Sequence, residues 1–210
     1  MFAQNEVKRA NHWYYATNIA LDFTCAPPTD VPGCQLGSSE CATTMSTANG
    51  DLLFYSDGVR VWDRNNNLMP NGSGLAGSTS TVQGALAVPH PGNPNRYFLF
   101  TAGSSIEDMG LVGLNYSEID MTLNAGNGDV VVATKNTFLF SPNEEKLTAV
   151  RNASNTGYWV TAQEKSGNSW YTYEVTAAGV NPTPVISVTG PNARVDNSLM
   201  AKFSPDGNWL

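Results

Sequence analysis

Acidic residues offer the clearest catalytic chemistry in this sequence, because two carboxylates that face one another across a cleft can hydrolyse a glycosidic bond. Asp57 precedes a glycine and Asp129 follows an Asn-Gly pair, positions in which aspartate usually shapes a turn. Asp120 falls at the end of a predicted strand, and the sequence contains no Gly-x-Ser-x-Gly motif. We therefore assign no catalytic residue and lean against an enzyme. The acidic candidates considered were Asp22, Asp57, Asp120, Asp129, Glu118, Glu144 and Glu145.

Metal ligands are the second kind of chemistry to consider. The cysteines and the two histidines, His12 and His90, have spacings that match no zinc pattern. The Asp63–Asn67 turn (DRNNN) begins like a calcium loop, with oxygen donors at alternate positions. Its sixth and twelfth positions are Leu68 and Gly74, where an EF-hand needs glycine and a bidentate glutamate. The sequence therefore predicts no metal and no cofactor.

The three cysteines indicate a cross-link rather than catalysis. Cys25 and Cys34 bracket a Pro/Gly-rich stretch that can form neither a helix nor a central strand. A covalent link would stabilise such a loop, so we favour a Cys25–Cys34 disulfide if the protein is exported. Cys41 begins a predicted strand and is expected to be a small buried thiol. A Cys34–Cys41 bridge stays open as an alternative.

Aromatic side chains are the remaining candidates, because exposed rings can stack on sugars or anchor a protein partner. Trp170, Tyr171 and Tyr173 lie in one predicted strand, in which neighbours point to opposite faces, so at least one of them must point outward. We take these three as binding candidates. Trp62 and Trp159 are expected to pack inside the core.

Composition limits the partners that such a site can have. Charged residues are only 14% of the 210 residues and the formal net charge is −7, with no basic run that could neutralise nucleic-acid phosphates. No stretch approaches the length of a membrane span. A polar surface built from Asn, Ser, Thr and Gly suits an extracellular protein. Residues 1–10 are expected to be an N-terminal tail, either an ordinary terminus or a signal-peptide remnant around Phe2-Ala3-Gln4.

A recurring strand-turn-strand unit must position these residues. Such units, each a small antiparallel sheet, predict an all-β fold in which residues 11–210 form one incomplete β-propeller. We expect about three four-stranded blades and the start of a fourth, with Trp13–Ala16 as a possible closing strand. A β-sandwich is the alternative. The four copies of the unit are Cys41–Tyr55, Gly84–Phe100, Leu147–Val160 and Leu199–Leu210.

Several motifs in order resemble one known family. Leu53–Gln83 contains LFYSDG, VW, MPNG and STSTVQ, and it continues into ALAVPHPGNPN and YFLFT at Ala85–Thr101. Later pieces are Tyr116–Leu123 (YSEIDMTL), Glu145–Val150 (EKLTAV) and Lys202–Asn208 (KFSPDGN). This series resembles the N-terminal β-propeller of large surface proteins of Bacteroidetes that carry type IX secretion signals and include gliding-motility-associated proteins.

The resemblance implies a secreted or cell-surface protein with a binding or structural role and with further blades in the full-length chain. We therefore expect a non-catalytic module for adhesion that binds carbohydrate or another surface protein. The alternative is a fragment of a propeller glycosidase or lyase whose catalytic residues lie partly in other blades. A pair of carboxylates on one axial face would favour the enzyme, and a face of exposed aromatics would favour binding.

Overall fold

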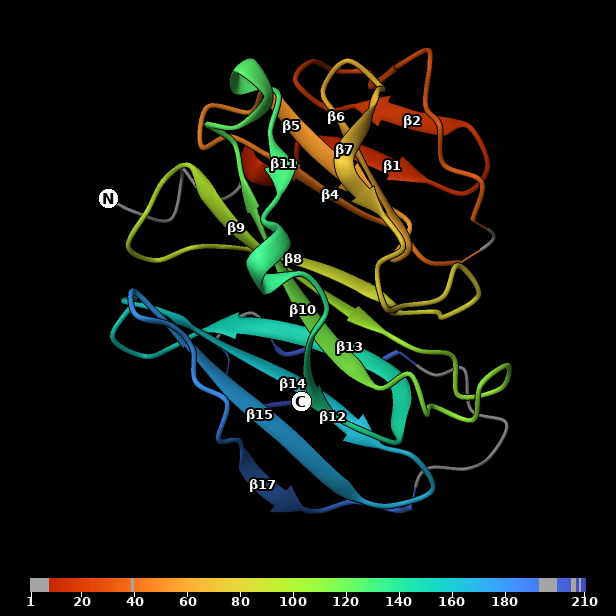
Figure 1. Cartoon of the computed structure of the whole chain (residues 1–210), viewed down its shortest axis with the longest axis vertical. Coiled ribbons are helices and arrows are strands. Elements are labelled where there is room, and N and C mark those ends of the chain that lie inside the picture. The colour runs from red at the N-terminus through yellow and green to blue at the C-terminus, as the bar shows by residue number, and fades with distance from the viewer. Residues whose placement is uncertain (1–7, 39, 193–199, 205–206, 208) are drawn as a thin grey trace.

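The chain folds into four antiparallel sheets that follow one another along the sequence, and none of them closes on itself. This computed structural model describes residues 8–38, 40–192, 200–204, 207 and 209–210. Figure 1 shows the sheets in chain order along the long axis of the molecule, with β1 and β2 at one end and β17 at the other. The fold is therefore all-β, as the sequence predicts.

The first two sheets are simple meanders. The first has the order β1-β2-β3, and the second has the order β4-β5-β6-β7. Their strands are β1 (His12–Tyr15), β2 (Ile19–Asp22), β3 (Thr29–Asp30), β4 (Thr43–Ser46), β5 (Leu52–Ser56), β6 (Arg60–Asp63) and β7 (Leu68–Ser73).

The third and fourth sheets each add a fifth strand to a meander. The third has the order β11-β10-β9-β8 with β12 also paired to β10, and the fourth has the order β13-β14-β15-β16 with β17 also paired to β15. The third contains β8 (Ala85–Pro89), β9 (Arg96–Ala102), β10 (Leu114–Asp120), β11 (Asp129–Val130) and β12 (Thr137–Phe140). The fourth contains β13 (Asn143–Arg151), β14 (Tyr158–Glu164), β15 (Ser169–Thr176), β16 (Gly179–Val180) and β17 (Val185–Val188).

Helix is confined to single 3₁₀ turns in the described ranges. They are η1 (Lys8–Ala10), η2 (Asn124–Gly126) and η3 (Val132–Thr134). Within those ranges no helix has the length and apolar character that crossing a membrane requires.

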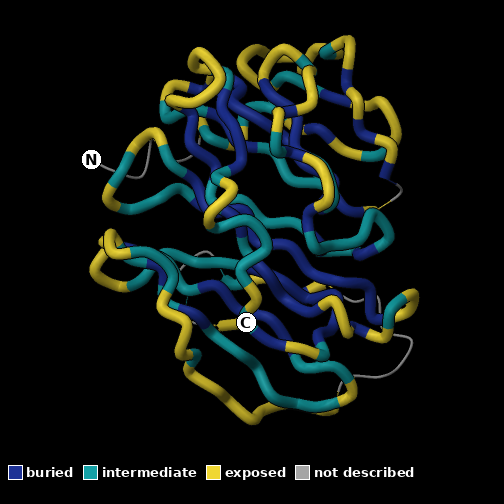
Figure 2. Tube along the Cα trace, viewed as in Figure 1, coloured by how far each residue is buried: buried dark blue, intermediate teal, exposed yellow. Residues whose placement is uncertain are grey.

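The alternation of side chains along each strand builds the core between the sheets. In β9, Tyr97 and Leu99 pack toward the second sheet, whereas Phe98 and Phe100 pack toward the fourth. The third sheet is therefore buried on both faces. Figure 2 shows that the exposed residues of the chain are concentrated in the turns and in β17.

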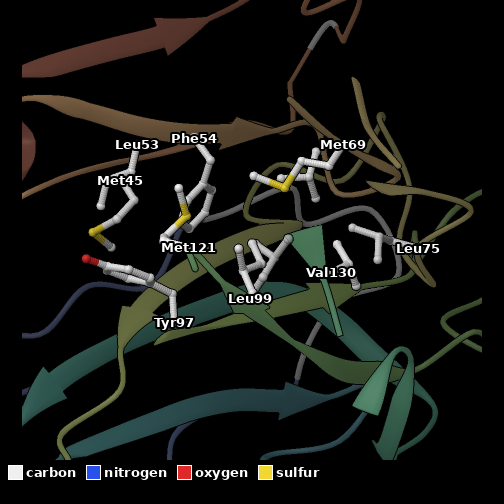
Figure 3. Packing of buried hydrophobic residues seen from close by; sticks show 11 residues of the cluster. Met45, Leu53, Phe54, Met69, Leu75, Tyr97, Leu99, Met121 and Val130 are labelled. Atoms are coloured by element: carbon white, nitrogen blue, oxygen red, sulfur yellow. The ribbon is translucent and has the colours of Figure 1, made fainter. Parts of the chain in front are cut away.

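Three apolar clusters fill the three spaces between successive sheets. The cluster between the second and third sheets joins Met45, Leu53, Phe54, Met69 and Leu75 to Tyr97, Leu99, Met121 and Val130, as Figure 3 shows. The cluster between the first and second sheets includes Tyr14, Leu36, Tyr55 and Trp62, and the one between the third and fourth includes Phe98, Phe100, Leu114, Val160, Tyr173 and Val175.

The first strands of the four sheets lie side by side. Strand β1 contacts β4, β4 contacts β8, and β8 contacts β13. Threonine hydroxyls of β4 form hydrogen bonds to both neighbouring strands. Thr44 Oγ1 accepts one from the Tyr14 N–H in β1 at 3.0 Å, and Thr43 Oγ1 accepts one from the Ala87 N–H in β8 at 3.3 Å. Small side chains in β4 and β8 thus allow close approach between sheets.

The two ends of the chain bear on two further expectations. Trp13–Ala16 was named as a possible closing strand, and His12–Tyr15 does form a strand, which pairs with Ile19–Asp22 in the first sheet. The fourth copy of the repeated unit was expected to begin a strand at Leu199, which lies outside the described residues, and residues 200–204, 207, 209 and 210 contain no strand. Residues 1–7 of the expected tail also lie outside the described ranges. Four separate sheets likewise differ from the two sheets of a sandwich.

Leu99 tests whether the clusters between sheets hold the fold together. Its side chain is fully buried between the second and third sheets. We expect Leu99→Ala to lower the free energy of unfolding by about 2–5 kcal/mol in urea denaturation, because the substitution leaves a cavity. The matched control is Leu111→Ala, at a side chain that is 62% exposed, with an expected change within about 0.5 kcal/mol. Equal losses in the two variants would contradict this account.

Candidate functional site

The three aromatic candidates in β15 divide between its two faces. Tyr173 is fully buried in the cluster against the third sheet, and burial raises the pKa of its hydroxyl. Tyr171 packs on the same face and stacks on Phe140 with ring centroids 4.3 Å apart. Trp170 points to the opposite face and is only partly buried. Of the three, Trp170 is therefore the one placed to meet a ligand.

The opposite face of the fourth sheet carries a groove, which we call the Trp groove. It is a cavity of about 400 Å³ lined by Val150, Trp159, Thr161, Trp170, Thr172, Val185, Ser187 and Thr189, together with Phe203, Gly207 and Leu210 near the C-terminus. Trp159 was expected in the core, but it lines this groove and is half-buried. The groove therefore brings together two indole rings and several hydroxyl groups.

Strand register fixes the order of the groups in the Trp groove. Trp159 lies opposite Glu174, Thr161 opposite Thr172, and Gln163 opposite Trp170. The two indoles therefore sit at diagonal ends of the face, with the threonine pair between them. The hydroxyls of Thr161 and Thr172 are 2.9 Å apart and hydrogen-bonded to each other.

Two of the acidic candidates, Asp57 and Asp129, accept hydrogen bonds from backbone N–H groups. Asp57 accepts hydrogen bonds from the N–H groups of Val59 and Arg60, and its other oxygen lies 2.7 Å from the Arg60 guanidinium. Asp129 accepts hydrogen bonds from the backbone and side chain of Asn71 in β7. Each carboxylate thus shapes a turn or ties two sheets together.

Asp120 closes the turn after β10. Its Oδ1 accepts hydrogen bonds from the N–H and hydroxyl of Thr122 at 2.9 and 2.6 Å, and its Oδ2 accepts one from Arg96 at 3.1 Å. Burial opposes ionisation, but these hydrogen bonds and the charge of Arg96 outweigh it and lower the pKa of Asp120. Glu118 shares the same arginine at 3.3 Å.

The lowered pKa of Asp120 predicts acid sensitivity. An unfolded aspartate has a pKa of about 4, so between pH of about 5 and 3 the unfolded chain binds more protons than the folded chain. The free energy of unfolding therefore falls as pH falls, and Asp120→Asn should flatten this dependence in urea titrations at several pH values. Asp30→Asn, at an exposed residue of β3, is the control and should keep the wild-type slope. An unchanged slope in Asp120→Asn would refute the assignment.

Glu145 is a buried carboxylate that links distant segments. Its Oε1 accepts hydrogen bonds from the Ser104 hydroxyl and from the N–H and hydroxyl of Ser105, at 3.0 to 3.1 Å. Its Oε2 accepts one from the Val82 N–H at 3.0 Å. These four hydrogen bonds, three to Oε1 and one to Oε2, join β13 to the loops before β8 and after β9. Glu145 is therefore a structural tether, a role that no local sequence signal indicates.

Replacing the Glu145 carboxylate tests this tether. In Glu145→Gln the new amide faces donors that need an acceptor, so we expect the free energy of unfolding to fall by about 1–3 kcal/mol. Urea denaturation measures the loss. Glu40→Gln is the matched control at an exposed glutamate and should change little. Wild-type stability in Glu145→Gln would show that the tether contributes nothing.

The three cysteines are free thiols in this structure. Cys25 is exposed and its thiol donates to the carbonyl of Pro27 at 3.6 Å. Cys34 is buried in the cluster that contains Tyr55, and burial raises its pKa. Neither the predicted Cys25–Cys34 disulfide nor the Cys34–Cys41 alternative is formed in this structure, in which Cys25 faces solvent and Cys34 and Cys41 are both buried. Cys41 is a fully buried thiol with a raised pKa, as expected.

No protein-family model, curated protein or solved structure matches this chain. The site must therefore be interpreted from its own geometry. Sequence reasoning named Trp170 as a binding candidate, but it did not group Trp159, Thr161 and Thr172 with it. The period of two along β14 and β15 places Trp159 with Thr161, and Trp170 with Thr172, so this signal could have found them.

Proposed function

We propose that this chain is a non-catalytic binding module of an exported bacterial surface protein, and that its Trp groove binds carbohydrate. The observation that carries the proposal is the placement of Trp159 and Trp170 at diagonal ends of a face whose centre is the Thr161–Thr172 pair. Indole rings offer flat apolar surfaces for sugar rings, and hydroxyls between them can exchange hydrogen bonds with sugar hydroxyls.

The size of the groove agrees with a small polar ligand. A volume of about 400 Å³ lies within the usual range for small-molecule sites. Threonine and serine supply hydrogen-bonding groups without fixed charge, which suits a neutral saccharide. A segment of another surface protein is the competing ligand, and absence of retention on every polysaccharide would favour it.

We further infer that the four sheets are blades of a partial β-propeller. The side-by-side row of β1, β4, β8 and β13, with later strands of each meander farther out, supports this arrangement. Further blades of the full-length protein would then be partners of this chain, and a blade packed on the fourth sheet would compete with carbohydrate for the Trp groove. The motif series that resembles Bacteroidetes surface proteins supports secretion to the cell surface or the medium.

The glycosidase or lyase alternative requires a second carboxylate at the site. Among the described residues, no Asp or Glu lines the Trp groove or the cavity between the β8–β9 and β13–β14 turns. A cavity beside the first sheet contains one, Glu40. The pair of carboxylates that would favour hydrolysis is not brought together in these three cavities.

A polysaccharide screen tests the proposed function directly. The 210-residue protein is passed over immobilised neutral polysaccharides, and both retention and release of soluble product are measured. We expect retention without product on at least one polysaccharide. Trp170→Ala should weaken it about tenfold, because the variant loses one stacking surface.

The matched control is Trp13→Ala, which removes a 53% exposed indole from the first sheet. It should keep wild-type retention, and both variants should keep the wild-type melting temperature. Release of product would show an enzyme. Retention that depends on Trp13 rather than Trp170, or no retention on any polysaccharide, would contradict the assignment of the Trp groove.

A further inference from the structure

An amine, a primary amide and a carboxylate meet where the second and third sheets touch at their later strands. Strand β7 of the second sheet lies beside β11 of the third, and Figure 1 shows the two strands together. Asn71 in β7 and Asp129 in β11 face each other across this contact. Lys135 stands between the η3 turn and β12 of the third sheet. The fold thus brings together three groups from two sheets, with Asn71 lying 58 and 64 residues from the other two.

The Asn71 amide is held against the carboxylate. Asp129 Oδ1 accepts hydrogen bonds from the backbone N–H groups of Asn71 and Val130, each at 2.8 Å, and its Oδ2 accepts one from Asn71 Nδ2 at 2.6 Å. Asp129 is buried, and hydrogen bonds to carboxylates are shorter and stronger than those between neutral groups. These bonds fix the amide with its nitrogen directly against the Asp129 carboxylate.

The Lys135 amine is held at the same asparagine. Its Nζ donates a hydrogen bond to the backbone carbonyl of Asn71 at 3.0 Å and another to the carbonyl of Ser73. The neighbouring Asn136 anchors this segment, because its Oδ1 accepts a hydrogen bond from the Ala76 N–H at 2.9 Å. The amine is therefore positioned by its own hydrogen bonds and by those of the residue that follows it.

The amide carbon of Asn71 lies within reach of this amine. Only Cα and Cβ separate the Asn71 Cγ from the backbone carbonyl that already binds Nζ. Lysine has a flexible four-carbon stem, so rotation about its terminal bonds carries Nζ from the backbone carbonyl toward Cγ. Holding two reacting groups in one place converts a collision between separate molecules into an effectively unimolecular step and lowers its barrier.

We propose that Lys135 and Asn71 form an isopeptide bond, a covalent cross-link between the second and third sheets that Asp129 promotes. The unprotonated Lys135 amine attacks the Asn71 Cγ, so that the Nζ–Cγ bond forms and the Cγ–Nδ2 bond breaks. One proton passes from Nζ to the Asp129 carboxylate and from there to Nδ2, which leaves as ammonia. An amine and an amide thus become a substituted amide and ammonia, and no other reactant is consumed.

The cross-link would reinforce an interface that the cluster around Leu99 otherwise holds by packing. It would join residues that are 64 positions apart, and closing so long a loop removes much of the conformational freedom of the unfolded chain. No residue of the Trp groove takes part in the reaction. The inference therefore stands whether or not that groove binds carbohydrate.

The intact mass of the denatured 210-residue protein tests the bond. After incubation at mildly alkaline pH, which favours the unprotonated amine, we expect a mass below that of the sequence by one ammonia. Digestion should yield one branched peptide that contains Asn71 and Lys135, with no tryptic cleavage after Lys135. A protein that keeps the full sequence mass after this incubation would overturn the proposal.

Variants of the three groups assign the roles. Lys135→Arg removes the nucleophile and should keep the full sequence mass. Lys165→Arg is the matched control at another lysine whose amine donates to a backbone carbonyl, and it should still lose ammonia. Asp129→Asn should slow the loss about 100-fold, because the group that transfers the proton is absent. Loss at the wild-type rate in Asp129→Asn would remove Asp129 from the mechanism.

Cyclisation of Asn71 onto the following Gly72 also releases ammonia and is the competing source of the same mass change. This side reaction needs no lysine, so a loss of ammonia that persists in Lys135→Arg would refute the cross-link. Conversion of Asn71 to aspartate, seen as a small gain in mass without a branched peptide, would refute it as well. The peptide map of the wild-type protein decides between these products even where a variant does not fold.

Discussion

Every sheet in this protein has two faces, and each apolar face must be covered. Period-two alternation in β9 sends Leu99 to one neighbouring sheet and Phe98 to the other, so the third sheet is stable only between two others. A row of four such sheets has three internal interfaces and two outer faces. The Trp groove lies on one outer face and the cavity that contains Glu40 lies beside the other. The location of the candidate site thus follows from the way the core is built.

The face that carries the Trp groove differs chemically from the internal faces. The cluster between the third and fourth sheets is made of aromatic and aliphatic side chains such as Phe100, Val160 and Val175. On the other side of the same two strands, Thr161 and Thr172 take the central positions. The two hydroxyls bond each other at the edge of a groove whose other lining residues are mostly apolar or aromatic. The face therefore combines apolar surface with a small hydrogen-bonding centre.

Local signals in the sequence predicted the all-β class, and the propeller assembly of the sheets stays a prediction. The unit predicted at Gly84–Phe100 is found as the hairpin of β8 (Ala85–Pro89) and β9 (Arg96–Ala102). The separate first sheet was missed, since His12–Tyr15 looks the same in sequence whether it closes a ring or pairs with its neighbour. The alternation of side chains along β15 predicted that Trp170, Tyr171 and Tyr173 divide between the two faces of the fourth sheet. Which of these faces is buried depends on the packing of the third sheet, and the sequence of β15 does not contain that information. The tethering role of Glu145 was not identifiable from the sequence, because two of its hydrogen-bond partners, Ser105 and Val82, lie 40 and 63 residues away in the chain.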